Sequence, residues 1–350
     1  MRKILVRGTN WVGDAVMSIP ALREIRRIFP GAHISLLAKP WVKDVYSSVD
    51  FVDELIEYDR QSNRSGWWNL VRLAADLKRN HFDMAILLQN AFEAAFLAWR
   101  ARIPVRLGYA RDGRSILLTH PCRIDPRLKK VHQSYYYLGI LAGAGLIENC
   151  LWERPDYPLD IRIGVRTEDR ASAKAILRAR GIEAGQLVVG LNPGASYGGA
   201  KRWLSDRYAR VADELARRHD AHIVIFGAAG ESQIAQQVAE AMTTAPVILA
   251  GQTTLGQLMG LIKECSLMIT NDSGPMHLAA ALDVPQLAIF GSTSEVATGP
   301  LSNQAEVIKH PVECNPCFLR ECPIDFRCMT LITVERVVDA AERKLRAAAG

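Results

Sequence analysis

Residues 267–281 read Leu267-Met268-Ile269-Thr270-Asn271-Asp272-Ser273-Gly274-Pro275-Met276-His277-Leu278-Ala279-Ala280-Ala281. This stretch starts as a short apolar strand and passes through a polar turn into a helix that begins with Ser, Gly and Pro. A helix start leaves backbone N–H groups without partners at a positive dipole end, so it can bind an anion. Asp272 and His277 flank that helix start, and a carboxylate beside a phosphate suits sugar hydroxyls. The stretch therefore predicts a site for a nucleotide diphosphate-sugar.

The same alternation of strand and helix runs along the whole chain. Short apolar, β-branched runs alternate with helical patterns, which is typical of parallel α/β sheets. The pattern predicts strands at 3–7, 33–37, 54–58, 84–88, 187–191, 222–226, 247–249, 267–270 and 286–290. It predicts helices at 15–28, 67–79, 134–144, 206–218, 232–242, 255–263, 276–282 and 334–348.

A segment of loop composition at 153–160 separates two similar halves. We therefore expect an α/β protein of two Rossmann-like, doubly wound domains that face a central cleft. The expected domains are 1–160 and 161–332, followed by a helix at 333–350 that packs back on the N-terminal domain. In such a fold the carboxyl ends of the strands carry the ligands.

Composition and length agree with a globular protein that has two cores. The chain has 350 residues, of which 49% are apolar. No apolar run reaches the roughly 18 residues that span a bilayer, and Arg7 and Asn10 interrupt the N-terminus before a signal-peptide core forms. We therefore expect a cytoplasmic protein.

Positive charge is concentrated in the first half of the chain. The net charge is +6, and the stretch from Ala95 to Lys130 holds nine basic residues against two acidic ones. Such a run is commonly a solvated face, but it also suits an anionic partner such as a phosphorylated substrate or an anionic membrane surface. Nucleic acid is disfavoured, because the run lacks interleaved aromatic residues and no DNA-reading motif accompanies it.

Four of the seven cysteines lie close together, as Cys314-x2-Cys317-x4-Cys322-x5-Cys328. Without an export signal, the odd total predicts reduced thiols. Four thiolates can hold a structural zinc ion, although this spacing is not that of a zinc ribbon. Packed or exposed thiols without a metal are therefore the preferred interpretation.

Two further loops follow strands and carry polar residues. In the first, residues 8–14, Asp14 sits at the start of a helix, where it can act as the helix N-cap or as a general base. The second, residues 191–203, is rich in glycine and ends in Lys201 and Arg202, so it can offer N–H groups and a charge to a diphosphate. Neither matches a dinucleotide fingerprint or a Walker P-loop. Near residue 227, Glu231 is a carboxylate that can bind ribose hydroxyls.

These loops together resemble a known family, the ADP-heptose:lipopolysaccharide heptosyltransferases. The resemblance rests on Asn10-Trp11-Val12-Gly13-Asp14, on Asn192-Pro193-Gly194-Ala195 with Lys201-Arg202-Trp203, and on Asn271-Asp272-Ser273-Gly274-Pro275-Met276-His277. Gly291-Ser292-Thr293 and Thr298-Gly299-Pro300 fit it as well. Within the family, the branch that adds the second heptose of the inner core is the most similar. The resemblance covers nearly the whole chain in order.

The resemblance implies a GT-B fold with an acceptor-binding N-terminal domain and a donor-binding C-terminal domain. It implies inverting, metal-independent transfer of heptose from ADP-L-glycero-D-manno-heptose to heptosyl-Kdo2-lipid A, without a cofactor. Asp14 and Lys201 become catalytic, as base and as the charge that neutralises the departing diphosphate. The donor contacts are Asn192, Gly194, Ala195, Ser196, Lys201, Glu231, Asp272, Ser273, Gly274 and His277. The acceptor contacts are Asn10, Trp11, Arg111 and Arg114.

An acceptor that bears carboxylates and phosphates also gives the basic stretch a partner. We expect peripheral attachment to the inner leaflet of the cytoplasmic membrane, driven by that stretch. Three alternatives stay open: transfer to another acceptor, such as Kdo2-lipid A or an outer heptose, a sugar-nucleotide epimerase of the same fold, and a non-catalytic nucleotide-sugar-binding protein.

Overall fold

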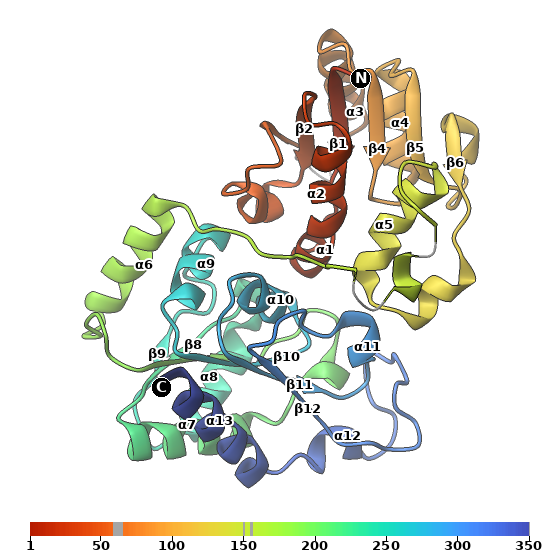
Figure 1. Ribbon diagram of the computed structural model, residues 1–350. Coiled ribbons are helices and arrows are strands. Elements are labelled where there is room, and N and C mark those ends of the chain that lie inside the picture. Colours follow the sequence, from red (N-terminus) through yellow and green to blue (C-terminus); the bar gives the residue numbers. More distant parts are fainter. Residues whose placement is uncertain (59–65, 150, 155–156, 350) are drawn as a thin grey trace. The chain divides into compact units, whose positions relative to one another are not determined.

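The chain divides into two compact units, Met1–Ile161 and Arg162–Gly350. A computed structural model (Figure 1) describes residues 1–58, 66–149, 151–154 and 157–349. The division lies one residue from the boundary expected between 160 and 161. Each unit has its own sheet and its own core.

The first unit contains a six-stranded parallel sheet in the order β3-β2-β1-β4-β5-β6. Its strands are β1 (Lys3–Arg7), β2 (His33–Ala38), β3 (Glu54–Glu57), β4 (Met84–Leu87), β5 (Val105–Tyr109) and β6 (His120–Cys122). Its helices are α1 (Val12–Met17), α2 (Ile19–Ile28), α3 (Gly66–Arg79), α4 (Phe92–Arg100) and α5 (Gln133–Gly143), with short turns η1 (Pro40–Tyr46), η2 (Ser115–Leu117), η3 (Pro126–Lys130) and η4 (Leu151–Glu153).

Alternating residues of these strands supply two apolar faces. Leu5, Leu37 and Leu87 pack with apolar residues of α3 and α4 on one face. The helices α2 and α5 pack together, and α1 contacts both.

The second unit repeats this plan, with the order β12-β11-β10-β7-β8-β9 and all pairs parallel. Its strands are β7 (Val188–Asn192), β8 (His222–Ile225), β9 (Val247–Ile248), β10 (Leu267–Asn271), β11 (Gln286–Phe290) and β12 (Ala305–Lys309). Its helices are α6 (Thr167–Arg178), α7 (Ser205–His219), α8 (Ser232–Ala241), α9 (Leu255–Lys263), α10 (Gly274–Ala281), α11 (Glu295–Thr298), α12 (Arg327–Thr330) and α13 (Val334–Ala349), with turns η5 (Gly199–Lys201) and η6 (Ala229–Glu231).

Both sheets place their first and fourth strands side by side. In the first unit β1 pairs with β4, and in the second β7 pairs with β10. The chain order reverses at this pair, and in open parallel sheets ligands bind where that reversal occurs, beyond the carboxyl ends of the strands. We therefore expect ligand-binding residues in the segments that follow these four strands.

The helix expected at 15–28 is two helices in the structure. The first ends at Ser18, whose hydroxyl donates to the carbonyl of Ala15 at 2.7 Å. The second, α2, has Pro20 in its first turn, where the missing N–H does no harm. Together the serine side chain and the proline break the helical pattern that the apolar spacing predicted.

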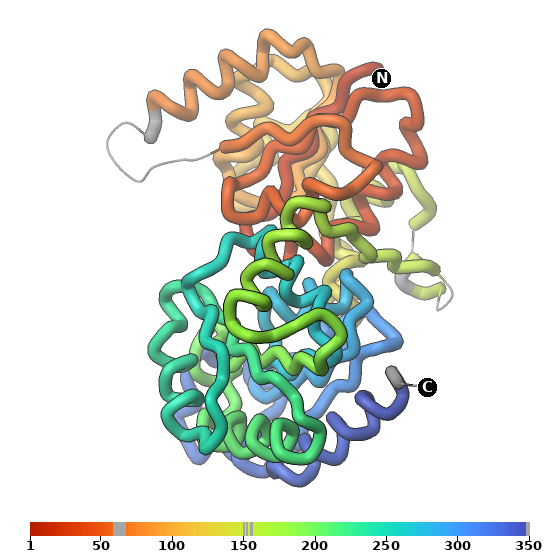
Figure 2. The backbone as a smooth tube through the Cα atoms, turned by 90° about the vertical axis from the view of Figure 1, so that its left-hand side faces the viewer, coloured from red at the N-terminus to blue at the C-terminus, as the bar shows by residue number. Residues whose placement is uncertain are grey.

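The final helix belongs to the second unit. Val334, Val337 and Leu345 lie in the core of that unit, and α13 runs beside α7 (Figure 2). This placement corrects the expectation that 333–350 forms a segment apart from the second domain. In the described part of the chain, no helix is both long enough and apolar enough to cross a bilayer.

Candidate functional site

The start of α10 in the second unit is an uncapped helix N-terminus. Ser273 is the N-cap residue, with extended backbone, but its side chain makes no capping hydrogen bond. Its hydroxyl instead lies 3.2 Å from the Nδ2 atom of Asn192 and 3.2 Å from the hydroxyl of Thr270. Because no side chain caps the first turn, its N–H groups face outward at the positive end of the helix dipole. The geometry suits an anion, as the sequence predicts.

Lys201 and Asp272 form an ion pair beside this helix start. The Nζ atom of Lys201 lies 2.6 Å from Oδ2 of Asp272, and the two side chains are 13% and 4% exposed. The hydroxyls of Thr293 and Thr298 donate to the same oxygen, at 2.6 and 3.4 Å. The two residues, which the sequence assigns to different tasks, therefore share one hydrogen-bonded cluster.

Asn271 ties the loop after β7 to the end of β10. Its side-chain oxygen accepts from the backbone N–H of Trp203 and from the hydroxyl of Tyr208, both at 3.0 Å. Its Nδ2 donates to the carbonyl of Pro193 at 2.8 Å. The nearby Asn192 is 1% exposed, and its Oδ1 has no hydrogen-bond partner among the described residues. This buried acceptor atom, next to an uncapped helix start, is a place where a ligand hydroxyl can donate.

Glu231 lies against the glycine-rich loop. Its carboxylate accepts from the N–H of Ala228 at 2.9 Å. A Cβ atom added to Gly194 would lie 2.3 Å from the carboxyl carbon of Glu231, so only glycine leaves room for this approach. The structure thus brings this carboxylate to the carboxyl ends of β7 and β8, where the sequence predicts a ribose contact.

The remaining predicted donor contacts differ in exposure. Ala195 is buried, Ser196 is exposed, and Gly274 opens α10. His277 lies one turn into α10 and is 4% exposed. Ala195 and Ser196 therefore lie on the loop that leads to Lys201, and Gly274 and His277 lie on the helix that follows Asp272.

The four clustered cysteines do not assemble a metal site. Within the described ranges, no group of three or more His, Cys, Asp or Glu side chains is arranged to hold a metal ion. Cys328 is buried and Cys314 exposed. Burial raises the pKa of the Cys328 thiol, and the three neighbouring thiols raise it further. The four-thiolate geometry that the spacing allows is not formed among the described residues of this segment.

The cysteine-bearing segment instead clamps the loop that carries Lys201. The hydroxyl of Tyr197 donates to the carbonyl of Phe318 at 2.7 Å, and the N–H of Ala200 donates to the carbonyl of Arg320 at 2.8 Å. The N–H of Gly199 donates to the carboxylate of Glu321 at 3.0 Å. Three hydrogen bonds thus fix the backbone just before Lys201.

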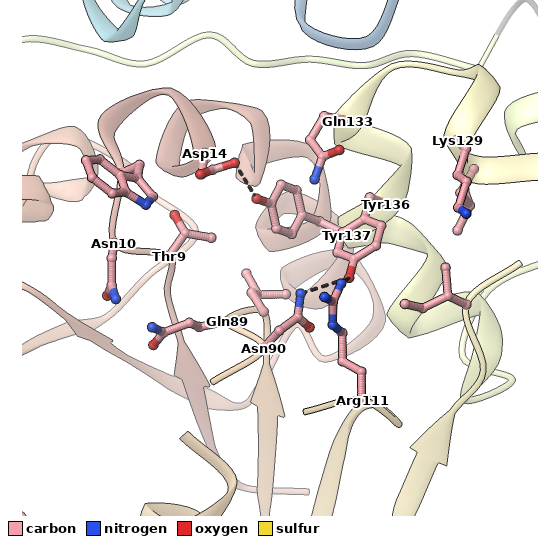
Figure 3. Close-up of a pocket in the computed structure, with 14 residues that line it drawn as sticks. Thr9, Asn10, Asp14, Gln89, Asn90, Arg111, Lys129, Gln133, Tyr136 and Tyr137 are labelled. Carbon is pink, nitrogen blue, oxygen red and sulfur yellow. Dashed lines mark hydrogen bonds between the residues drawn. The ribbon is translucent and has the colours of Figure 1, made fainter. Parts of the chain in front are cut away.

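The first unit contains a pocket of about 480 Å³ at the carboxyl ends of β1 and β4 (Figure 3). Its lining combines apolar surface from Trp11, Leu88, Ile124 and Leu128 with the polar side chains of Thr9, Asn10, Asp14, Gln89, Asn90, Arg111, Lys129, Gln133, Tyr136 and Tyr137. Polar groups of both charges in one concave site are typical of a binding pocket for a small polar molecule. Three of the four predicted acceptor contacts, together with the predicted base, line this pocket.

Asp14 is not the N-cap of α1, which is one of the two roles that its spacing allows. The N-cap is Trp11, and Asp14 lies in the first turn, at the pocket. The hydroxyl of Tyr137 donates to Oδ1 of Asp14 at 2.8 Å. Burial raises the pKa of Tyr137 well above 10, and the charge of Asp14 raises it further. The phenol therefore stays protonated and orients the carboxylate.

A buried arginine shapes the loop that carries Asn10 and Trp11. Arg7 is 1% exposed, and its Nη2 atom donates to Oδ1 of Asn10 at 2.9 Å. Burial lowers the pKa of Arg7 to about 10, so the side chain stays charged at neutral pH. Trp41 donates from its indole to the carbonyl of Asn10 at 2.8 Å, and Trp11 is 67% exposed at the pocket rim.

Arg114 has a different place from the predicted one. Its side chain is completely buried and does not line the pocket, so it cannot be a direct acceptor contact. Its guanidinium donates to the carbonyls of Tyr109 and Gln89 and to Oδ1 of Asn90. Arg111, in contrast, is exposed and lines the pocket. The sequence shows that Arg114 is charged, but it does not show that the folded chain places backbone carbonyls around the guanidinium.

The basic residues between Ala95 and Lys130 also differ in their surroundings. Arg106 donates to two backbone carbonyls, and Arg127 pairs with Asp125 and Glu153. The exposed basic residues that remain are Arg100, Arg102, Arg111, Arg123, Lys129 and Lys130.

The sequence interpretation missed several residues of both sites. Tyr137, Tyr136, Gln89 and Asn90 line the pocket, and Thr293 completes the Asp272 cluster. Gln89 and Asn90 follow β4 directly, so a strand-end rule could have found them. The tyrosines lie on a helix distant in sequence and gave no such signal.

Comparison with known proteins identifies the family. The profile of glycosyltransferase family 9 (heptosyltransferase) matches residues 70–326. The chain is 33% identical to lipooligosaccharide heptosyltransferase 2 of Haemophilus ducreyi, over 88% of each chain. It is 31% identical to lipopolysaccharide heptosyltransferase 2 of Escherichia coli, again over 88% of each. The solved structure of E. coli ADP-heptose lipopolysaccharide heptosyltransferase II matches with a TM-score of 0.85 at 29% identity, over 99% of this chain and 100% of that one.

These matches agree with the two six-stranded parallel sheets and their flanking helices, which are the sheets of a GT-B protein. The family profile covers well over half of the chain and includes the residues of both strand-end loops of the second unit. The chain therefore belongs to glycosyltransferase family 9, the heptosyltransferases, and is a glycosyltransferase.

Proposed function

We propose that this enzyme moves L-glycero-D-manno-heptose from ADP-heptose to the first heptose of the lipopolysaccharide inner core, with inversion and without a metal ion. The observation that carries the proposal is the Asp14 carboxylate, oriented by Tyr137 in a polar pocket. The names of the relatives from H. ducreyi and E. coli, both heptosyltransferase 2, support the second heptose as the one transferred.

The second unit binds the donor in this proposal. The open N–H groups of α10, at Ser273 and Gly274, receive the diphosphate, and Glu231 takes the ribose hydroxyls. Lys201 neutralises the diphosphate as it leaves. Since Lys201 already pairs with Asp272, the carboxylate first positions the ammonium group and then holds heptose hydroxyls. Asn192, Gly194, Ala195, Ser196 and His277 complete the donor contacts.

The first unit binds the acceptor. Asp14 removes the proton from the attacking hydroxyl, and the oxygen attacks the anomeric carbon from the side opposite the diphosphate, which inverts that carbon. Asn10, Trp11 and Arg111 contact the acceptor sugar. The positive charge needed by the leaving group comes from Lys201 and the helix N-terminus, so the step requires no divalent cation.

A lipid-linked acceptor also implies contact with a membrane. We propose peripheral attachment to the cytoplasmic face of the inner membrane through exposed basic residues, among them Arg123, Lys129 and Lys130. Charge reversal of these three residues should abolish binding to vesicles that contain anionic lipid. Retained binding would remove this part of the proposal. Arg114 and Arg127, which are buried or paired, are unsuitable for that test.

The test of the reaction uses purified protein, ADP-heptose and two acceptors, Kdo2-lipid A and heptosyl-Kdo2-lipid A, with mass spectrometry of the products. The proposal expects transfer only to the second acceptor, in buffer with excess EDTA. Transfer only to the first acceptor would contradict the assignment. Release of free sugar without any acceptor would indicate an epimerase, and donor binding without turnover would indicate a binding protein.

Asp14→Asn tests the base. Turnover should fall by about 10²-fold or more, while affinity for ADP-heptose stays within two-fold, because the second unit holds the donor. Unaltered turnover would remove Asp14 from the mechanism.

A further inference from the structure

The hydroxyl of Tyr136 occupies an unusual place in the pocket of the first unit. Tyr136 lies on α5 and is half-buried among the lining residues (Figure 3). The Nδ2 atom of Asn90 donates to its oxygen at 2.8 Å, and Nη1 of Arg111 donates to it at 3.4 Å. Both lone pairs of the phenolic oxygen are therefore directed at protein donors.

The orientation of the Asn90 amide is fixed by Arg114. Nη2 of that buried guanidinium donates to Oδ1 of Asn90 at 3.1 Å. A guanidinium has donors and no acceptor, so the amide oxygen must face Arg114 and the amide nitrogen must face Tyr136. Arg114 in turn is held by the carbonyls of Tyr109 and Gln89.

Because Asn90 and Arg111 both donate to the oxygen of Tyr136, the hydroxyl proton of Tyr136 is free to be donated to a separate acceptor. Among the residues that the structure describes, no acceptor for this proton is present within hydrogen-bond distance. The cations Arg111 and Lys129 line the same pocket. A hydroxyl donor beside two cations matches an anionic oxygen.

A second observation also indicates a ligand in this pocket. The Oε1 atom of Gln89 is buried and has no partner in the described part of the chain, although Gln89 lines the pocket. A buried acceptor atom without a partner costs free energy, which a ligand hydroxyl would recover. The pocket thus presents an unused donor and an unused acceptor.

We propose that Tyr136 is an acceptor-binding residue whose hydroxyl, aligned by Arg114 through Asn90, donates to an anionic oxygen of the acceptor beside Arg111. This inference rests on the proposed function and deepens it. The anionic oxygen is a carboxylate or a phosphate oxygen, both of which the proposed acceptor carries. Asn90 and Arg114 are positioning residues, since they act through Tyr136.

The central test is Tyr136→Phe, which removes one hydroxyl. Loss of a hydrogen bond to a charged group should raise the acceptor KM about 10-fold or more, with kcat and the KM for ADP-heptose within two-fold of the wild type. Tyr135→Phe is the matched control, because Tyr135 is the preceding residue of α5 and does not line the pocket. An acceptor KM that Tyr136→Phe leaves unchanged would overturn the proposal.

Asn90→Asp tests whether Asn90 orients the hydroxyl of Tyr136 or only supports the fold of the pocket. The N90D carboxylate would accept from Arg114 and also take the proton of Tyr136, so the hydroxyl would no longer point to the ligand. The acceptor KM should rise while thermal stability stays equal or increases. In the double variant N90D/Y136F the second change should add nothing to the effect of the first. If the two effects multiply, Asn90 acts by charge alone and the alignment fails.

Two further comparisons identify which acceptor group Tyr136 contacts and whether a negative result concerns this inference or the proposed function. With dephosphorylated acceptor, a persisting effect of Tyr136→Phe assigns the contact to a carboxylate, and a lost effect assigns it to a phosphate. If the wild type transfers heptose to neither acceptor, the proposed function itself is wrong, and this inference falls with it. Normal wild-type transfer with no effect of Tyr136→Phe overturns the inference alone.

Discussion

The ion pair of Lys201 and Asp272 makes a sharp prediction about stability. Asp272→Asn leaves the ammonium of Lys201 without its carboxylate, at a site where the two side chains are 13% and 4% exposed. The hydroxyls of Thr293 and Thr298 lose the same anionic acceptor. Because water cannot replace that carboxylate fully, the variant should be strongly destabilised.

The expected size follows from this burial. Breaking a buried pair by removing one partner costs about 3–5 kcal/mol. In a unit of this size that corresponds to a fall in Tm of about 6–20 °C. Lys201→Met should be destabilised to a similar degree, since it leaves the carboxylate unpaired. The double variant K201M/D272N has neither charge and should lose only about 1–2 kcal/mol.

Differential scanning calorimetry of the four proteins measures this cycle. The exposed pair of Lys43 and Glu57, with side chains 39% and 50% exposed, is the matched control and should show coupling below about 1 kcal/mol in K43M/E57Q. The double variant K201M/D272N should regain thermal stability but not turnover, because the charge for the leaving group is gone. Additive losses from the two single changes would refute the reasoning.

Three other predictions concern residues outside this pair. Gly194→Ala should raise the KM for ADP-heptose about 10-fold, because the added Cβ would lie 2.3 Å from the carboxyl carbon of Glu231, the proposed ribose contact. Gly230→Ala, whose added Cβ would meet open space, is the control. Equal kinetics for the two variants would contradict the ribose contact. Gln286→Met should stabilise the protein by about 1–3 kcal/mol, since the side-chain nitrogen and oxygen of this completely buried residue have no partner among the described residues. Urea denaturation measures the free energy of unfolding of both proteins. A lower value for the variant would contradict the prediction. Burial raises the pKa of Asp213, but hydrogen bonds from residues 243–244 outweigh this effect and hold that pKa below its usual value. The wild type should therefore exceed D213N in Tm at neutral pH, and this advantage should shrink as the pH falls below about 4. A Tm difference that stays constant or grows as the pH falls below about 4 would be incompatible with this reasoning.

All nine strands that the sequence predicted occur in the structure, including the partly exposed edge strands β3 and β9. β1, β4, β10 and β11 are short apolar runs between polar loops, and hydrophobic pattern alone locates them. The strands that it missed are β5, β6 and β12, which lie at or next to a sheet edge. In β5, Arg106 and Gly108 interrupt the apolar run. β6 has three residues including a proline, and β12 is only half-buried, so neither carries the apolar run that the pattern detects.

The site was predictable to the extent that it follows strand ends. Asp14, Lys201 and Asp272 all lie within a few residues of the carboxyl end of β1, β7 or β10, where ligands bind in open parallel sheets. Contacts between distant segments were not predictable. The pairing of Lys201 with Asp272 and the hydrogen bond from Tyr137 to Asp14 join residues that only the completed fold brings together.

The repeated strand order has a further consequence for how the enzyme is organised. In both sheets the first and fourth strands are neighbours, and in both the segment that follows the first strand carries a charged residue of the proposed chemistry. In one unit that residue is a carboxylate, Asp14, and in the other it is an ammonium group, Lys201. In the proposed reaction the two segments therefore carry opposite charges. The carboxylate would take the proton that leaves the nucleophile, and the ammonium group would stabilise the negative charge that leaves with the diphosphate.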